Sequence, residues 1–280
     1  MSAAIRAFVR LGAQPLLLAL ALVVWFSAGR EPIALAGAML SVLASTTMLE
    51  LLIPAQPGWR LTGRQWAALV TAHLALAVLF GLVAGTYERL LRPALQPLSE
   101  AVFGSLWPHH TSWLVQAIAL FLLSDLVYYW IHRGIHTCGS LWRASGHAVH
   151  HSFHNLHAVH AGLTHPMEIA LLAGPLALLA ATFGVAADVV GAAAVVFAGN
   201  AILAHANLDI DPPLLRLLLT NSNQHRVHHS RRTQQSNRNF ACNAIVWDRL
   251  FGTFAAEPVS RTGTGPRQPG LRDMLMAPFR

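Results

Sequence analysis

Long apolar runs are the feature of this sequence that most restricts its fold. Five tracts are long enough to cross a bilayer as a helix, which takes about 20 residues. They are Leu11 to Ala28, Ile33 to Ile53, Gln65 to Tyr87, Trp113 to Ile131 and Glu168 to Ala204. The last tract is too long for one span and is interrupted near Pro175 and Gly184, so we expect a hairpin of two spans there. Because an open chain satisfies its backbone in hydrocarbon only as helix, the sequence predicts an all-α polytopic membrane bundle of about four to six spans.

Composition agrees with a membrane protein and bears on its partners. Charged residues make up 11% of the 280 residues, whereas soluble domains carry roughly a quarter. Every basic side chain is arginine, and the net charge is +7. The arginines lie between apolar runs and form no dense patch with interleaved aromatics, so we expect anionic lipid headgroups, and no nucleic acid, as their counter-charge. Cys138 and Cys242 are too isolated for a disulfide framework or a C-x-x-C site.

Basic residues also indicate how the chain crosses the membrane. Arg6 and Arg10 precede the first span, and Arg60 and Arg64 lie between the second and third, so both pairs should face the cytosol. Counting spans forward puts the two histidine-bearing segments, from residue 132 and from residue 205, on that same face. The first span lacks a clear small-residue cleavage site, and we expect a retained anchor in preference to a signal peptide.

Histidines cluster in three short motifs. HAVHH (147–151) and HRVHH (225–229) share the pattern H-x-x-H-H, and HRGIH (132–136) reads H-x-x-x-H directly after the fourth span. Residues three and four apart lie on one side of a helix, so each box should project all its imidazoles to that side. Imidazole suits iron, zinc and copper, and one ion takes at most about six ligands, so eight imidazoles predict two metals. The eight are His132, His136, His147, His150, His151, His225, His228 and His229.

A structural role is the simplest alternative for any one of these residues. A lone histidine near a membrane face is usually a hydrogen-bonded structural residue, and one H-x-x-x-H among 16 histidines is unremarkable. Three boxes on one side of the membrane favour a metal centre. A membrane metal carrier would also have such clusters, but carriers place ligands inside the spans to form a path, whereas these boxes follow the spans.

Four segments together resemble a known family. DLVYYWIHRGIH (125–136), LWRASGHAVHHS (141–152), HRVHHS (225–230) and WDRLFGTF (247–254) are similar to the fatty acid hydroxylase superfamily, also called the sterol desaturase family. The resemblance implies a membrane enzyme whose eight box histidines hold two iron ions without haem. It implies a ninth ligand, His205 in HANL, and an active site on the cytosolic face. The implied reaction uses O2 and two electrons to hydroxylate or desaturate a C–H bond of a lipid.

The resemblance divides the chain and implies its partners. We expect an N-terminal transmembrane region over 1–112, a catalytic region with a cytosolic helical cap over 113–256, and a loosely ordered tail over 257–280. The sequence has no haem or flavin fingerprint, so electrons should come from a separate donor, a ferredoxin or a b-type cytochrome with its reductase. A polar headgroup should lie at a cytosolic rim near Arg133, Arg143 and Arg226. A catalytically silent lipid-binding relative remains an alternative, although all eight box histidines are present.

Carboxylates inside apolar runs need partners. Asp125 lies seven residues before His132, almost two helical turns away on the same face. We expect it to accept the ring N–H of a ligating histidine, with direct ligation of a metal as the alternative. Glu50 should face the bundle interior, with a partner that the sequence does not name. Family members often have an aromatic–glycine pair after an asparagine, whereas this chain has Asn239-Phe240-Ala241, which puts a local turn in question because alanine tolerates positive φ poorly.

The remaining histidines lie outside the boxes. His154, His157 and His160 extend past the second box and are too far along a helix to share one cluster with His147, so we expect interfacial positions for them, with a peripheral metal or proton-relay role as the alternative. His165 could cap the next span or line the site. His73, His109 and His110 are expected to be structural.

Overall fold

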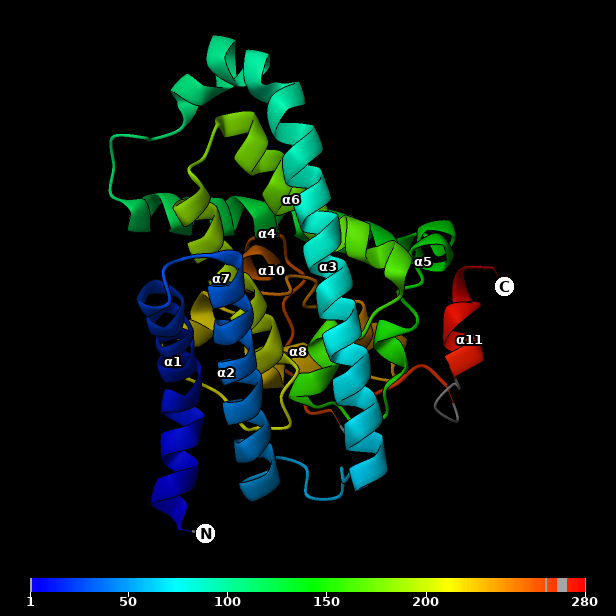
Figure 1. Ribbon diagram of the computed structural model, residues 1–280. Coiled ribbons are helices and arrows are strands. Elements are labelled where there is room, and N and C mark those ends of the chain that lie inside the picture. Colours follow the sequence, from blue (N-terminus) through cyan, green and yellow to red (C-terminus); the bar gives the residue numbers. More distant parts are fainter. Residues whose placement is uncertain (1, 260, 266–270, 280) are drawn as a thin grey trace.

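Helices build the molecule throughout the residues that the computed structural model describes, which are 2–259, 261–265 and 271–279 (Figure 1). Six of the helices are long and apolar enough to cross a membrane. They are α1 Ala3–Ser27, α2 Pro32–Leu52, α3 Gly63–Leu98, α4 Trp113–Thr137, α6 Pro166–Phe183 and α7 Ala187–Ala204. The predicted all-α membrane bundle is therefore confirmed, at the upper end of the expected number of spans.

Short helical pieces connect and cover these long helices. They are η1 Ser99–Phe103, η2 Gly104–Leu106, α5 Gly139–Ser145, η3 His150–Ser152, η4 Ala158–Gly162, η5 Leu215–Leu217, α8 Ser222–His228, α9 Thr233–Ser236, α10 Val246–Leu250, α11 Leu271–Leu275 and η6 Ala277–Phe279. Apart from η1 and η2, they lie between α4 and α6 or after α7, in the two segments that carry the two H-x-x-H-H boxes.

Side-chain caps fix where the spans begin. Ser2, Thr62 and Ser112 each accept a hydrogen bond from the backbone N–H three residues further on, which satisfies an otherwise free donor of the first turn. His165 caps α6 in a similar way through its Nδ1, which accepts from Met167 N at 3.2 Å. Of the two roles considered for His165, the structure shows the cap.

The predicted hairpin of the last apolar tract breaks at a glycine. Gly184 ends α6 with a φ of 64°, a left-handed conformation that suits glycine, and α7 begins three residues later. Pro175 stays inside α6 and does not divide it.

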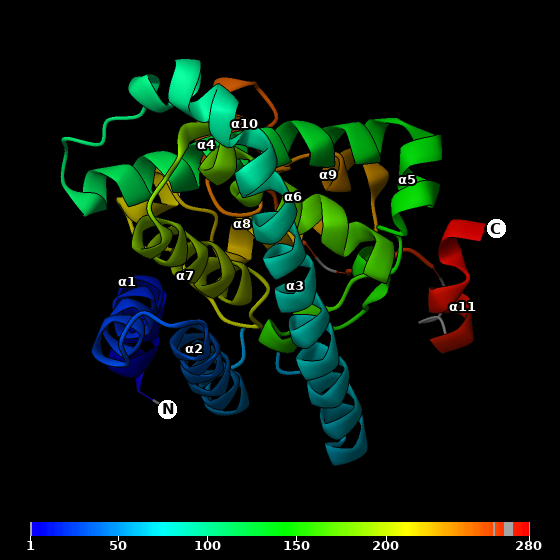
Figure 2. The ribbon, with the colours of Figure 1, turned by 45° about the horizontal axis from the view of Figure 1, so that its top comes forward.

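The long helices pack in two sets around α7 and α6. α1 and α2 pack against each other and against α7, α3 packs along α6, and α4 runs across both α6 and α7 (Figures 1 and 2). Buried amides tie the first set together: Gln14 Nε2 donates to Asn200 Oδ1 at 2.7 Å and to the Thr220 carbonyl at 3.0 Å. Such polar pairs between spans replace hydrogen bonds that hydrocarbon does not supply, and this one also holds the chain just ahead of α8.

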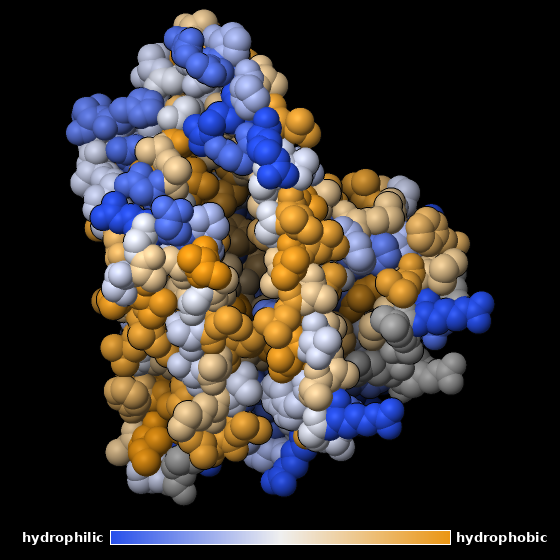
Figure 3. Space-filling model, in the orientation of Figure 1, coloured by the Kyte–Doolittle hydropathy of each residue, from blue (hydrophilic) through white to orange (hydrophobic). Residues whose placement is uncertain are grey.

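α3 is longer than predicted and faces lipid along most of its surface. It continues past residue 87 to Leu98, and His73 is its one buried residue in the described chain. Apolar side chains cover the outer faces of α1, α2 and α3, while hydrophilic side chains gather over the turn between α3 and α4 (Figure 3). This distribution is the one expected of helices that contact hydrocarbon.

Described residues of the tail contact the segment that follows α8. Glu257 accepts a hydrogen bond from Gln235, Arg231 N donates to the Arg261 carbonyl, and Ser230 pairs with Thr262 in an isolated bridge. These contacts join the first part of the tail to the segment after α8, and the expectation of a loosely ordered tail over 257–280 stays a prediction. The expectation for residues 260, 266–270 and 280 lies outside the described residues.

Packing between α1 and α7 predicts a selective effect of small substitutions. Gly191→Ala should lower thermal stability by about 1–3 kcal/mol, because a Cβ there would overlap the buried Trp25 ring. Gly81→Ala is the control, since a Cβ there meets nothing within 4 Å. Thermal unfolding in detergent measures both, and equal melting temperatures for the two variants would contradict this account of the interface.

Candidate metal centre

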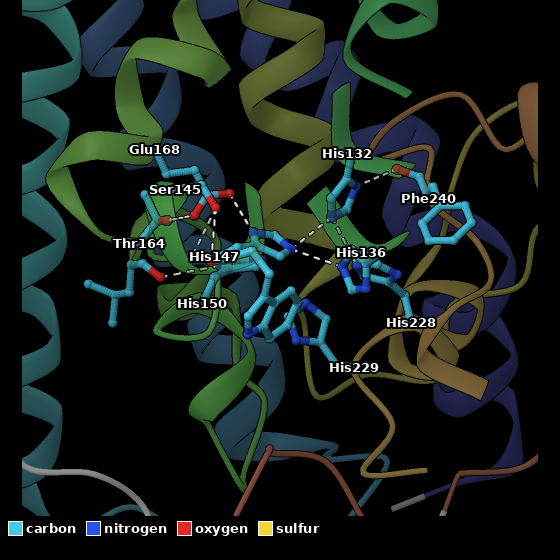
Figure 4. Close-up of polar contacts among 12 residues, drawn as sticks. His132, His136, Ser145, His147, His150, Thr164, Glu168, His228, His229 and Phe240 are labelled. Atoms are coloured by element: carbon cyan, nitrogen blue, oxygen red, sulfur yellow. Dashed lines mark hydrogen bonds and ion pairs between the residues drawn. The ribbon is translucent and has the colours of Figure 1, made fainter. Parts of the chain in front are cut away.

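The nine histidines singled out from the sequence come together in two groups. The first group is His132, His136, His147, His151 and His228, and the second is His150, His205, His225 and His229. Within each group, one ring nitrogen of every residue lies within 4.8 Å of the others. Figure 4 shows rings from α4, from the segment after α5 and from α8 turned toward one another. The nine therefore form sites that could hold metal ions, and their role as ligands stays a prediction.

Each H-x-x-H-H box serves both groups. His147 and His151, four residues apart, stay together in the first group, while His150 reaches the second. The last box does the reverse, with His225 and His229 in the second group and one ring, that of His228, in the first. The expectation that a box projects all its rings to one side is corrected, since successive helical residues point about 100° apart.

The two groups meet at a stacked pair of rings. His151 of the first group and His229 of the second lie with ring centroids 4.4 Å apart and planes inclined by 18°. The two groups therefore adjoin each other at His151 and His229.

The backbone at the second box is a turn and not a long helix. α5 ends at Ser145, and Gly146 follows with a φ of 71°, where a Cβ would lie 2.6 Å from the His165 side chain. His151 N then donates to the His147 carbonyl at 3.2 Å, which closes one helical turn. Glycine is required at this position because the conformation is left-handed and the space is filled.

Acceptor oxygens fix the tautomer of five rings. His132 Nδ1 lies 2.6 Å from Phe240 O, His147 Nδ1 2.6 Å from Glu168 Oε1, His228 Nδ1 2.9 Å from Arg238 O, His150 Nδ1 3.2 Å from Leu163 O and His205 Nδ1 2.7 Å from Ala201 O. Carbonyl and carboxylate oxygens accept and do not donate, so each Nδ1 carries the proton. Each Nε2 of a neutral ring is therefore a bare lone pair.

The bare Nε2 atoms nevertheless face each other at short range. His132 Nε2 lies 2.9 Å from His147 Nε2 and 3.1 Å from His228 Nε2, and His205 Nε2 lies 3.1 Å from His150 Nε2. Two lone pairs cannot hydrogen-bond to each other, so these contacts are repulsive unless a cation lies among them. Nitrogens about 2.1 Å from one ion and at right angles are about 3.0 Å apart. The donor set therefore fits a transition-metal ion in each group.

Burial keeps the rings in the form that binds metal. Loss of hydration lowers the pKa of His147, His151 and His228 well below the ordinary value of 6.5, and neighbouring imidazoles add to the effect. Neutral imidazole is the ligand form, so no proton has to be displaced. His151 Nε2 is in addition buried without a hydrogen-bond partner, as expected of an atom reserved for an ion.

Asp125 does not have the predicted contact. Its buried carboxylate accepts from the backbone N–H groups of Asn243 and Ala244, at 3.2 and 2.8 Å, while the Nδ1 proton of His132 goes to the Phe240 carbonyl. The prediction of a hydrogen bond to the His132 ring is therefore wrong. The physical reason is that residues 240–244 return to lie beside α4. The Asp125 carboxylate accepts hydrogen bonds from the backbone N–H groups of this segment and not from the ring.

Asp248 completes the support of that segment. Its two oxygens accept from Phe240 N and Ala241 N, both at 2.8 Å. The residue with a positive φ in this turn is Asn239, at 52°, and asparagine tolerates that conformation. Ala241 does not have a positive φ. The alanine in place of the family's glycine is therefore compatible with this turn. Asp248 holds the backbone of Phe240, whose carbonyl contacts His132, and Asp125 holds the same segment at Asn243 and Ala244.

Glu168 makes the contact that Asp125 was expected to make. It is buried near the start of α6, its Oε1 accepts the His147 Nδ1 proton, and Thr164 donates to its other oxygen (Figure 4). A carboxylate partner fixes ring orientation and makes the imidazole a stronger ligand. The sequence signal was available, since a carboxylate at the start of an apolar span needs a partner.

Glu50 faces the interior and joins two segments. Its Oε1 accepts from Ala158 N at 2.8 Å and from Asn207 N at 2.6 Å, which fixes η4 beside the chain that follows His205. The remaining histidines lie outside both metal groups and are His73, His109, His110, His154, His157, His160 and His165. Among them His73 has a structural bond, from Nδ1 to the Val159 carbonyl at 2.9 Å.

Comparison with known proteins defines the class. The family model described as fatty acid hydroxylase matches residues 117–253. The chain is 30% identical over 262 residues to ornithine lipid hydroxylase OlsE of Rhizobium tropici, covering 86% of this chain and 74% of that protein. It is 36% identical over 161 residues to an alkylglycerol monooxygenase of Danio rerio, covering 56% of this chain and 33% of the relative. No solved structure matches the chain.

The chain belongs to the fatty acid hydroxylase family. A very-long-chain aldehyde decarbonylase of Oryza sativa is a more distant relative, 28% identical over 149 residues, which are 52% of this chain and 54% of that protein. The matched segment of the alkylglycerol monooxygenase is a minor part of that longer protein. Membership of the family therefore does not assign the activity of that protein to this chain.

Single substitutions should remove metals one group at a time. His228→Ala in the first group and His229→Ala in the second should each lower the metal content from about two ions per chain toward one, because each group loses one imidazole. Elemental mass spectrometry of the purified protein measures the content. His110→Ala lies outside both groups and should leave it unchanged; identical content in all three variants would rule out ligation by the two groups.

Glu168 should set metal affinity without binding metal. Glu168→Gln keeps a hydrogen-bonding side chain but loses the charge opposite His147, so metal affinity should fall about 10–100-fold. Competition with a chelator measures the affinity, and the exposed Glu31→Gln removes the same charge far from the centre. Wild-type affinity in Glu168→Gln would show that the carboxylate has no such role.

Proposed function

We propose that this protein is a membrane-bound di-iron oxygenase, free of haem, that uses O2 and two electrons to hydroxylate or desaturate a C–H bond of a lipid. The observation that carries the proposal is the set of proton-free Nε2 atoms that face one another in two adjoining groups. Such an arrangement favours bound cations. Two adjacent metal ions held by these histidines would supply redox chemistry that a single structural ion does not.

Iron is the metal that accounts for both the ligands and the relatives. Imidazole binds zinc, copper, nickel and iron, but zinc has no redox chemistry. The names of the relatives, a hydroxylase and a monooxygenase, denote oxidations. Iron bound in the two groups would supply the activation of O2. In hydroxylation one oxygen atom enters the C–H bond and the other leaves as water with two protons, and in desaturation both leave as water.

The residues of the chain position the rings and limit water around them. Glu168 and the backbone carbonyls hold protons at Nδ1, so that Nε2 stays available. Aromatic side chains surround the first group: Tyr128 stacks on His132, Trp142 lies against His147, and Phe240 lies against His136. These contacts keep the ring orientations fixed and exclude solvent from the imidazoles, which favours oxidation of the substrate over release of reduced oxygen.

A lipid is the substrate that this setting supports. The centre adjoins helices whose outer faces are apolar, and the names of two relatives specify an alkylglycerol and an ornithine lipid. Arg10, on the arginine-bearing end of α1, pairs with Asp209 and Asp211 at 3.0 and 2.8 Å, shortly after His205. By the positive-inside rule this end faces the cytosol, which supports a cytosolic centre. Electrons would come from a separate ferredoxin or from a b-type cytochrome with its reductase.

Lipid analysis tests the function directly. Cells that express the protein should contain a lipid heavier by one oxygen atom, or lighter by two hydrogens, than in cells without it. His228→Ala should reduce that product at least about 100-fold because the first group loses a ligand, while His110→Ala should not. Mass spectrometry of total lipid extracts is the measurement. Two bound irons with no change in any lipid would argue for a silent relative, and movement of metal across vesicles would argue for a carrier.

A further inference from the structure

A polar cavity of about 610 Å³ lies outside the histidine centre. Its charged lining residues are Asp211, Arg216, Arg226, Arg249 and Glu257. α8 contributes Arg226, Asn223 and Gln224 to this cavity, and the same helix carries the histidines of the last box. Of the three arginines expected near a headgroup rim, Arg226 is the one that lines the cavity. Nothing in the proposed oxidation uses these residues.

The two acidic residues of the cavity already have partners. Asp211 accepts from Arg10 at 2.8 Å and from Arg216 at 3.3 Å, and Glu257 accepts from Gln235 at 2.9 Å. The charge of Asp211 is therefore balanced by two arginines of the protein, and one oxygen of Glu257 is occupied by Gln235.

Two arginines of the cavity have no acidic partner in the described part of the chain. Arg226 donates to the carbonyls of Ala206 and Leu208, and Arg249 donates to the carbonyl of Arg216 at 3.2 Å. The Arg249 guanidinium also lies 3.8 Å from the centroid of the Phe254 ring. Carbonyls and rings do not neutralise a guanidinium, so the cavity keeps an excess of positive charge.

Unused hydrogen-bond donors lie in the same lining. Arg226 is 7% exposed and Asn221 is 1% exposed. Arg226 Nε and Asn221 Nδ2 are buried and have no hydrogen-bond partner. Buried donors without acceptors are costly and call for an explanation, such as an unseen ligand. Because both atoms are donors and the local charge is positive, the complementary ligand is an oxyanion.

The cavity lies at the edge of the membrane region. Gln56, just after α2, lines it, and Asp211 N donates to the Arg10 carbonyl near the start of α1. The cavity therefore lies at the end of the hairpin where α1 begins and α2 ends. Exposed leucines flank its arginines: Leu214 is 79% exposed and Leu250 is 66% exposed. Arginines beside exposed apolar side chains are typical of the lipid headgroup zone.

We propose that this cavity binds the oxyanion, a phosphate or a carboxylate, of a membrane lipid headgroup. Arg226, Arg249 and Asn221 supply the donors, while the neighbouring leucines contact the acyl region. Placement in the headgroup zone favours a lipid over a soluble anion. The site is defined by charge and location, and it holds whether or not the bound lipid is the one oxidised at the histidine centre.

Lipid binding to the intact purified protein tests the site. Native mass spectrometry with dioleoylphosphatidylglycerol should show binding at least about tenfold tighter than with dioleoylphosphatidylcholine, because the cavity favours net negative charge. Arg249→Gln and, as a second variant, Arg226→Gln should each remove most of that preference, and Arg249→Lys should restore part of it. Arg64→Gln is the matched control, an exposed arginine at the start of α3 and outside the cavity lining.

Three outcomes would overturn the proposal. Equal binding of the two lipids would show no oxyanion preference. An equal loss in Arg64→Gln and Arg249→Gln would reduce the effect to general surface charge. Displacement of the lipid by inorganic phosphate at a concentration similar to that of the lipid would indicate a soluble anion as the ligand. Thermal unfolding of each variant confirms that the fold is retained in the comparison.

Discussion

Lone pairs directed at one another are the constraint on which this structure depends. Once an oxygen acceptor holds the proton of Nδ1, the Nε2 of that ring can only accept, and rings such as His132 and His147 then repel each other at 2.9 Å. The chain brings nine histidine rings together in two largely buried groups, and in five of these rings an oxygen acceptor holds the Nδ1 proton. Cations bound among the rings would resolve this conflict, so metal binding is expected to stabilise this part of the fold.

Buried carboxylates hold the segments that carry these rings. Glu168 bonds a ring directly, whereas Asp125 and Asp248 bond the backbone of 240–244, whose Phe240 carbonyl orients His132. Glu50 likewise accepts from a backbone N–H, that of Asn207, and so fixes the chain that follows His205. Four carboxylates thus lie around the two histidine groups, which themselves contain only imidazoles. Ions bound in these groups would have neutral ligands, and the nearest negative charges would belong to residues that contact the histidines or their backbone.

The sequence predicted the parts of this arrangement that depend on short-range periodicity. The spans followed from apolar runs, and the nine histidines followed from spacings of three and four together with the family resemblance. It could not predict that His150 and His228 exchange between groups, because that depends on how two separate turns approach each other. It also assigned Asp125 to a ring, since sequence distance along α4 does not reveal that residues 243 and 244 return to the same place. Long-range contacts decided each of the differences.

α8 is a short helix that carries residues of both the histidine groups and the cavity at the membrane edge. Its seven residues include His225 and His228, with His229 directly after them, and they also include Arg226 of the polar cavity. Adjacent positions on a helix point about 100° apart, so His225 and Arg226 necessarily face different surroundings. A ligand that fixed Arg226 would therefore restrict the rotation of the helix that supplies rings to both groups. The arginine within HRVHH therefore lies on a different side of α8 from the histidines, toward the cavity.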